Sequence, residues 1–98
     1  MTTKEFLDKY DNKEGFTSSE LEDLYWGDCE VEYTLIEESV GEHYRWVHEE
    51  NKIVKINDRY FELFAYIANT EYQDNEFDSP PIEVKPVEKT IIIWETID

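Results

Sequence analysis

Residues 14–44 read EGFTSSELEDLYWGDCEVEYTLIEESVGEHY, and their hydrophobic period changes at Gly27. Before Gly27, the apolar residues Leu21, Leu24 and Tyr25 have the spacing of one helix face. After Gly27, apolar residues alternate with acidic ones, which is typical of a strand with one face in water. A helix followed directly by strands indicates an α+β fold.

Two capping boxes predict where two N-terminal helices begin. Thr2 and Glu5 have the spacing of the first box, because the Glu lies three residues after the Thr. Thr17 and Glu20 repeat this spacing before the second helix. Gly27 stands where a left-handed residue commonly ends a helix. We therefore expect two short helices before the first strand.

The rest of the chain predicts about five antiparallel strands. Their expected ranges are 30–35, 44–48, 53–56, 60–67 and 90–97, with turns at Gly41, 49–51 and 57–58 and a bend at Pro86. At 98 residues the chain has room for one core. We expect a single domain over residues 1–98, with both helices packed on an antiparallel sheet.

The amino-acid composition limits the classes of binding partner and the cellular locations that we expect. The net charge is −16, while 40% hydrophobic and 15% aromatic residues are enough for a folded core. Nucleic acid and anionic membranes would repel such a chain, so we expect no direct contact with either. The N-terminus lacks the apolar core of a signal peptide. A cytoplasmic monomer or small homo-oligomer is expected.

Residues with catalytic or metal-binding chemistry are few. His43 and His48 lack the spacing of a metalloprotease helix, and Cys29 lies between two acidic residues that disfavour its thiolate. The acidic residues of segment 71–78 could hold a hard cation, but they lack the spacing of an EF-hand. The chain has only three Gly and no glycine-rich phosphate loop. We expect no enzyme activity, cofactor or metal ion.

Carboxylates without accompanying bases are the main functional signal. Residues 14–44 hold ten acidic residues and no Lys or Arg, and residues 62–84 also lack a base. One interpretation is a solvated acidic surface, but ordinary surfaces mix both signs. The other is a site for a basic partner. Its candidate residues are Glu20, Glu22, Asp23, Asp28, Glu30, Glu32, Glu37, Glu38, Glu42, Glu71, Asp74, Glu76 and Asp78.

The carboxylates could imitate nucleic acid. Alternate residues of a strand lie about 6.8 Å apart, and a DNA strand carries a phosphate about every 3.4 Å. The sequence therefore favours a non-enzymatic DNA mimic that binds the groove of a basic nucleic-acid-binding protein.

Several short segments give the chain a family resemblance. They are 1–7 (MTTKEFL), 20–24 (ELEDL), Trp26 with Gly27, 58–61 (DRYF), 69–75 (NTEYQDN), 81–84 (PIEV), 88–91 (EKTI) and Trp94. With them the chain resembles small proteins encoded by phages and prophages of Gram-positive bacteria. The resemblance implies a bacterial host cell as the location.

By size, charge and implied source, the chain is also similar to anti-CRISPR and anti-restriction inhibitors. This similarity implies a defence nuclease, above all a CRISPR effector, as the basic partner. The alternative is a phage structural or regulatory interaction protein without nucleic-acid mimicry, whose contacts would be exposed aromatics such as Tyr72 and Phe77.

Overall fold

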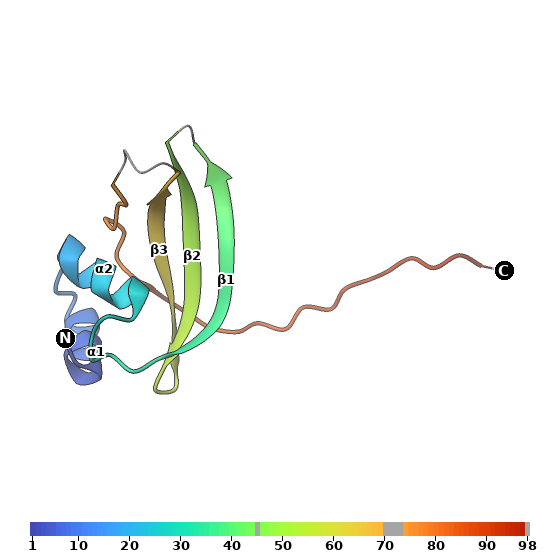
Figure 1. Ribbon diagram of the computed structural model, residues 1–98. Helices are drawn as coiled ribbons and strands as arrows, with labels where there is room; N and C mark the ends of the chain where they lie inside the picture. The colour runs from blue at the N-terminus through green and yellow to red at the C-terminus, as the bar shows by residue number, and fades with distance from the viewer. Residues whose placement is uncertain (45, 70–73, 98) are drawn as a thin grey trace.

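The fold is a four-stranded antiparallel sheet with two short helices on one of its faces (Figure 1). This computed structural model describes residues 1–44, 46–69 and 74–97. The elements are α1 (Thr3–Asp11), α2 (Ser18–Trp26), β1 (Thr34–His43), β2 (Val47–Ile56), β3 (Arg59–Ala68) and β4 (Ile82–Val84). The strands follow one another in the sheet in the order β1-β2-β3-β4. The α+β prediction is confirmed, but the described residues form four strands rather than about five.

Both helices begin at the predicted capping boxes. The Thr2 side chain accepts a hydrogen bond from the Glu5 backbone N–H, and the Glu5 side chain accepts one from the Thr2 backbone. Thr17 and Glu20 make the same reciprocal pair at the start of α2. Each box satisfies two N–H groups that a helix start otherwise leaves without a partner.

Gly27 ends α2 in the left-handed conformation, with φ of 74°. A Cβ at this position would also lie 3.3 Å from the Tyr33 hydroxyl. Gly27→Ala is therefore expected to lower the free energy of unfolding by about 1 kcal/mol or more. Gly15→Ala is the matched control, because a Cβ there meets nothing within 4 Å. Urea unfolding of both variants tests this expectation, and equal midpoints would contradict it.

The first strand lies later in the sequence than the predicted range 30–35, and the predicted strands 44–48 and 53–56 are one strand, β2. β1 continues through Gly41, and β2 continues through residues 49–51, so neither place is a turn. A Cβ at Gly41 would lie 2.9 Å from Oε2 of Glu49, so this glycine permits a close cross-strand approach. β1 instead ends at His43, and β2 begins at Val47. The tight turn at residues 57–58 is confirmed, with Asn57 at φ of 56°.

The core lies between the helices and one face of the sheet. Phe6 of α1 and Phe61 of β3 have no exposed surface, and their rings meet edge to face with centroids 5.1 Å apart. Val54 and Ile56 of β2 are buried beside them. We call the opposite face of the sheet, which carries half-buried Tyr60, the open face, because no helix covers it in the described chain.

The C-terminal strand predicted for residues 90–97 is not formed. After β4 the chain carries no secondary structure to residue 97, and Figure 1 shows it running away from the sheet past β1. We call residues 85–97 the arm. No helix in the described part of the chain is long and apolar enough to cross a bilayer.

Candidate functional site

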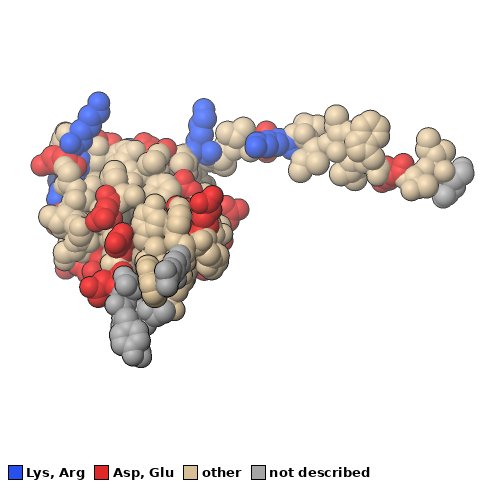
Figure 2. All heavy atoms as spheres, turned by 90° about the horizontal axis from the view of Figure 1, so that it is seen from above, with Lys and Arg blue, Asp and Glu red and all other residues tan. Residues whose placement is uncertain are grey.

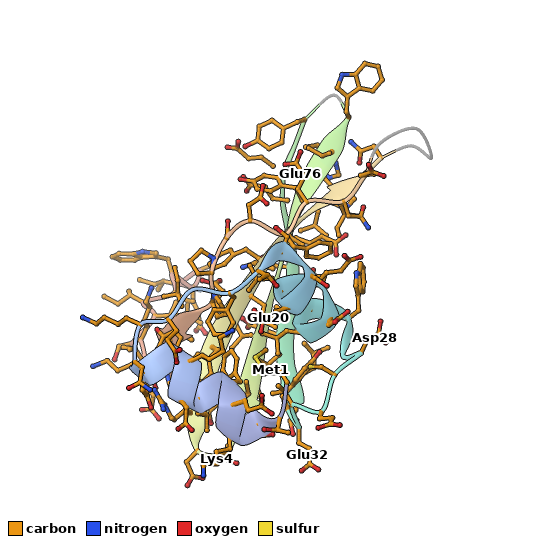
Figure 3. The ribbon with its side chains drawn as sticks, turned by 90° about the vertical axis from the view of Figure 1, so that its left-hand side faces the viewer. Met1, Lys4, Glu20, Asp28, Glu32 and Glu76 are labelled. Atoms are coloured by element: carbon orange, nitrogen blue, oxygen red, sulfur yellow. The ribbon has the colours of Figure 1, made fainter. Side chains whose placement is uncertain are left out.

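The segment between α2 and β1 places three predicted carboxylates in solvent. Val31 is buried, and the Tyr33 hydroxyl donates a hydrogen bond of 2.9 Å to the Leu24 carbonyl. Because neighbouring residues point to opposite sides, Glu30 and Glu32 are exposed. The predicted alternation is therefore confirmed, although residues 31–33 lie outside any strand. Asp28 is exposed just before them, and Figure 3 shows Asp28 and Glu32 at the rim of the molecule.

β1 carries the next three carboxylates along the outer edge of the sheet. Glu37 lies opposite Ile53 in the register and shares the open face with it, whereas Glu38 lies opposite Lys52 on the helix side. The Glu38 carboxylate is 3.9 Å from the Lys52 ammonium. Glu42 accepts a hydrogen bond of 3.3 Å from the Tyr44 hydroxyl. We call the resulting group the acidic edge. Its residues are Asp28, Glu30, Glu32, Glu37, Glu38 and Glu42.

Glu20, the first of the predicted site residues, is engaged in the fold. Its carboxylate accepts a 2.9 Å hydrogen bond from the Thr17 backbone and lies 2.9 Å from Lys9 of α1. The Thr17 bond, followed by Lys9, lowers the pKa of Glu20 below its usual value. Glu20 thus links α2 to α1 through its ion pair with Lys9 and does not belong to the acidic edge. Glu22 and Asp23, further along α2, are exposed.

The predicted carboxylates of segment 71–78 lie elsewhere. Asp74, Glu76 and Asp78 are exposed, and Glu71 lies outside the described residues. Glu76 pairs with Tyr66 through two backbone hydrogen bonds, next to β3 and across the sheet from β1. Figure 3 shows Glu76 far from Asp28 and Glu32. The acidic edge and the described carboxylates of segment 71–78 are therefore separate groups and not parts of the single contact surface expected from the sequence.

The aromatic site of the alternative hypothesis also changes. Phe77 is buried, with 4% of its surface exposed, and its ring packs 5.7 Å from Tyr25 and 6.2 Å from Trp26. The prediction that Phe77 is exposed was wrong, because Phe77, although it lies inside a polar stretch, packs on α2. Tyr72 lies outside the described residues.

Several bases of the domain neutralise carboxylates within the fold. The Arg59 guanidinium binds Asp11 of α1 at 2.7 Å and Glu83 of β4 at 2.8 Å, and it lowers the pKa of both carboxyls. The Lys52 ammonium lies 4.1 Å from the Tyr25 ring centroid and donates to the Tyr25 carbonyl. Figure 2 shows Lys and Arg at one border of the molecule and on the arm, with Asp and Glu over the rest of that face.

The His and Cys side chains are the other groups with metal-binding chemistry. In the described ranges no three His, Cys, Asp or Glu side chains are placed to hold a metal ion. Cys29 is half-buried and free. His43 and His48 stack on each other across the β1–β2 pair, with ring centroids 5.2 Å apart.

His48 is held between two oxygen acceptors. Its Nδ1 lies 2.7 Å from Oδ1 of Asn69, and its Nε2 lies 2.6 Å from a carboxylate oxygen of Glu50. Only the imidazolium has an N–H on both nitrogens, so Asn69 first and Glu50 second raise the pKa of His48 above its ordinary value.

The raised pKa predicts a pH effect. The protonated His48 side chain should contribute fully to the free energy of unfolding below about pH 6.5, the pKa of an unperturbed His. This contribution should be lost as pH rises through the higher pKa of His48 in the folded state. Proton NMR titration should show His48 titrating above the ordinary range and moving lower in Asn69→Ala. His43→Gln identifies the His48 signal. An unchanged titration in Asn69→Ala would contradict the assigned cause.

Comparisons with known proteins add no relative. No family model matches the chain, and neither a curated protein nor a solved structure matches it. The resemblance to phage proteins and to anti-CRISPR inhibitors therefore stays a prediction.

Exposed apolar residues are the surface feature that sequence reasoning did not assign. On β1 they are Leu35, Ile36 and Val40, and on the arm they are Val87, Ile91, Ile92, Ile93, Trp94 and Ile97. Their signal in the sequence was the apolar run at residues 91–94, which was interpreted as a strand of the domain itself.

Proposed function

We propose that this protein binds the nucleic-acid-binding surface of a basic protein through its acidic edge and keeps nucleic acid away from that surface. The proposed partner class is a bacterial defence nuclease, with a CRISPR effector as the leading member. The observation that supports the proposal is a row of exposed carboxylates with a single, weak ion pair among the described residues, between Glu38 and Lys52.

The acidic edge matches a stretch of DNA in its length and in the sign of its charge. The ten residues of β1 span about 30 Å at about 3.4 Å per residue, which equals roughly nine base-pair steps of DNA. The carboxylates are sparser than the phosphates of a DNA strand over this length. We therefore infer that the edge follows a basic groove as one flat, negatively charged rim and does not copy each phosphate.

The remaining charge acts at longer range. A net charge of −16 on 98 residues creates a strong negative potential. Such a potential raises the rate of encounter with a basic surface, and added salt weakens it. Because the carboxylates of the acidic edge are exposed, binding should depend steeply on ionic strength.

The test is competition with DNA. Tagged protein is incubated with lysate of a Gram-positive host at low salt, bound proteins are eluted with a salt gradient, and each eluted partner is purified and offered labelled duplex DNA. We expect a basic nucleic-acid-binding protein that elutes as salt rises and whose DNA the acidic protein displaces. A partner that ignores salt, or that binds DNA and this protein together, would overturn the proposal.

A second candidate function is a protein-interaction module without nucleic-acid mimicry. One observation favours it: the arm exposes large apolar side chains, including Trp94 with 93% of its surface accessible. Salt separates the two candidates, because apolar contacts persist at an ionic strength that dissociates a charged pair.

A further inference from the structure

The arm is an isolated segment with the composition of a buried strand. Ile91, Ile92 and Ile93 each expose more than 70% of their surface, and Ile97 exposes 95%. Burying such side chains is favourable, because it removes apolar surface from water. A contiguous apolar surface of this kind marks an interaction site.

The residue types of the arm favour a strand with two covered faces. Residues 90–94 are β-branched or aromatic throughout, which suits extended pairing. In an extended chain Ile91 and Ile93 point to one side, and Ile92 and Trp94 point to the other. Both sides are thus apolar, as in strands buried within a sheet. The arm contains two Lys and two Glu, so it is neutral within a strongly acidic chain.

The sheet offers a matching free edge at β1. β1 is an outer strand that pairs only with β2 in the described chain, and all ten of its residues are exposed. Leu35, Ile36 and Val40 expose 45%, 50% and 59% of their surface there. β1 contains no Lys or Pro, and its protection against edge pairing consists of three Glu and two irregularities in its register with β2. The other outer strand, β4, has only three residues.

The arm leaves the domain beside this edge. Ile36 and Glu37 of β1, Ile53 of β2 and Tyr60 of β3 line a groove of about 340 Å³ together with residues 84–87, where the arm begins. The arm therefore starts at the N-terminal end of β1. If the arm continued from this end along β1 of its own chain, it would run parallel to β1, whereas every pair of this sheet is antiparallel.

We propose that two copies of this chain exchange arms, so that residues 91–97 of each copy form an antiparallel fifth strand on β1 of the other. An arm from a second copy can enter at the His43 end of β1 and run antiparallel to it. In a two-fold dimer the two sheets join into one. The strand order across the junction is β1 of one copy, the arm of its partner, its own arm and then β1 of the partner, and every neighbouring pair is antiparallel. Each arm gains a partner on both edges.

Electrostatics favours this arrangement over direct contact of two acidic edges. Two intervening strands separate the β1 strands by about 14 Å, at about 4.8 Å per strand. This distance exceeds the Debye length of about 8 Å at physiological salt. The neutral arms thus join two acidic domains at a tolerable distance. The inference does not depend on the proposed function, because it needs only the chain itself, but an arm paired on β1 would lie beside Glu37, Glu38 and Glu42 of the acidic edge.

Sedimentation equilibrium of the full chain tests the exchange. We expect a dimer at tens of micromolar, and at least a 100-fold weaker dimer for Ile92→Lys in the arm and for Val40→Lys on β1. The matched control is Ile82→Lys, which changes a 52% exposed isoleucine of β4 and should leave the dimer intact. A monomeric full chain, or a Val40→Lys dimer as tight as the unchanged one, would overturn the proposal.

Cross-linking distinguishes exchange from folding back within one chain. In a Cys29→Ser background, one chain carries Glu37→Cys and a second carries Ile93→Cys. Upon mixing and mild oxidation we expect disulfide-linked pairs of the two different chains. A control chain carries both Glu37→Cys and Ile93→Cys. If this chain forms an intrachain disulfide while the mixture of single-cysteine chains forms none, the arm pairs within its own copy and the proposed exchange is wrong.

Discussion

Phe6→Ala is expected to lower the free energy of unfolding by about 3–5 kcal/mol, the usual cost of truncating a buried Phe. The Phe6 side chain is fully buried, and its ring lies 5.5 Å from Phe16 and 5.1 Å from Phe61. It therefore joins α1, the start of α2 and β3 in one cluster. Small domains are stable by only about 5–15 kcal/mol, so the variant should unfold at much lower urea.

Phe6→Leu is the control for this prediction. It keeps most of the apolar volume and should cost less than about 1.5 kcal/mol. Urea unfolding monitored by circular dichroism compares the three proteins, with the transition midpoint as the readout. Equal midpoints for Phe6→Ala and the unchanged protein would show that α1 is not part of the cooperative core.

Local signals explain why the helices were predictable. A capping box such as that of Thr17 and Glu20 is complete within four residues, and its hydrogen bonds form wherever the rest of the chain lies. Gly27 likewise ends α2 through its own backbone conformation. The α+β class followed from the change of hydrophobic period at the same residue.

Strand ends and strand count depend on distant partners, so the sequence did not reveal them. Residues 49–51 looked like a turn because they are polar, yet Glu49 accepts hydrogen bonds from the Tyr44 and Tyr66 hydroxyls, and Asn51 donates to Glu62 of β3. These cross-strand bonds keep the polar residues inside β2. Conversely, residues 90–97 have strand propensity but no partner strand within the described chain, and propensity alone does not form a sheet.

The solvent exposure of most candidate residues was predictable from the sequence, but their arrangement as a surface was not. Glu30 and Glu32 were correctly placed in solvent, because Val31 between them and Tyr33 after them carry the apolar side. The sequence pattern could not predict that Glu32 and Glu76 lie far apart, because their separation depends on the order of the strands in the sheet.

Reversing charge on the acidic edge is expected to weaken partner binding by about 100-fold or more. The variant combines Glu30→Lys, Glu32→Lys, Glu37→Lys and Glu38→Gln. Like charges brought together at an interface cost several kcal/mol, and about 2.7 kcal/mol already equals 100-fold in affinity. Glu38 becomes Gln rather than Lys because its carboxylate lies 3.9 Å from Lys52, where a second ammonium would be repelled.

A control variant separates the acidic edge from net charge. Asp8→Lys, Glu14→Lys, Asp58→Lys and Glu88→Gln change the same number of charges at exposed positions that do not belong to the acidic edge. Both variants should fold, since none of the three edge glutamates changed to Lys forms an ion pair within the described residues.

Binding to the captured partner, measured across a salt series, discriminates the two variants. Loss of affinity in the edge variant alone would locate the contact on β1 and the segment before it. Equal losses in both would mean that the partner responds to total charge through long-range attraction. Unchanged binding in both would remove electrostatics from the mechanism and leave the apolar arm as the surface through which this protein recognises its partner.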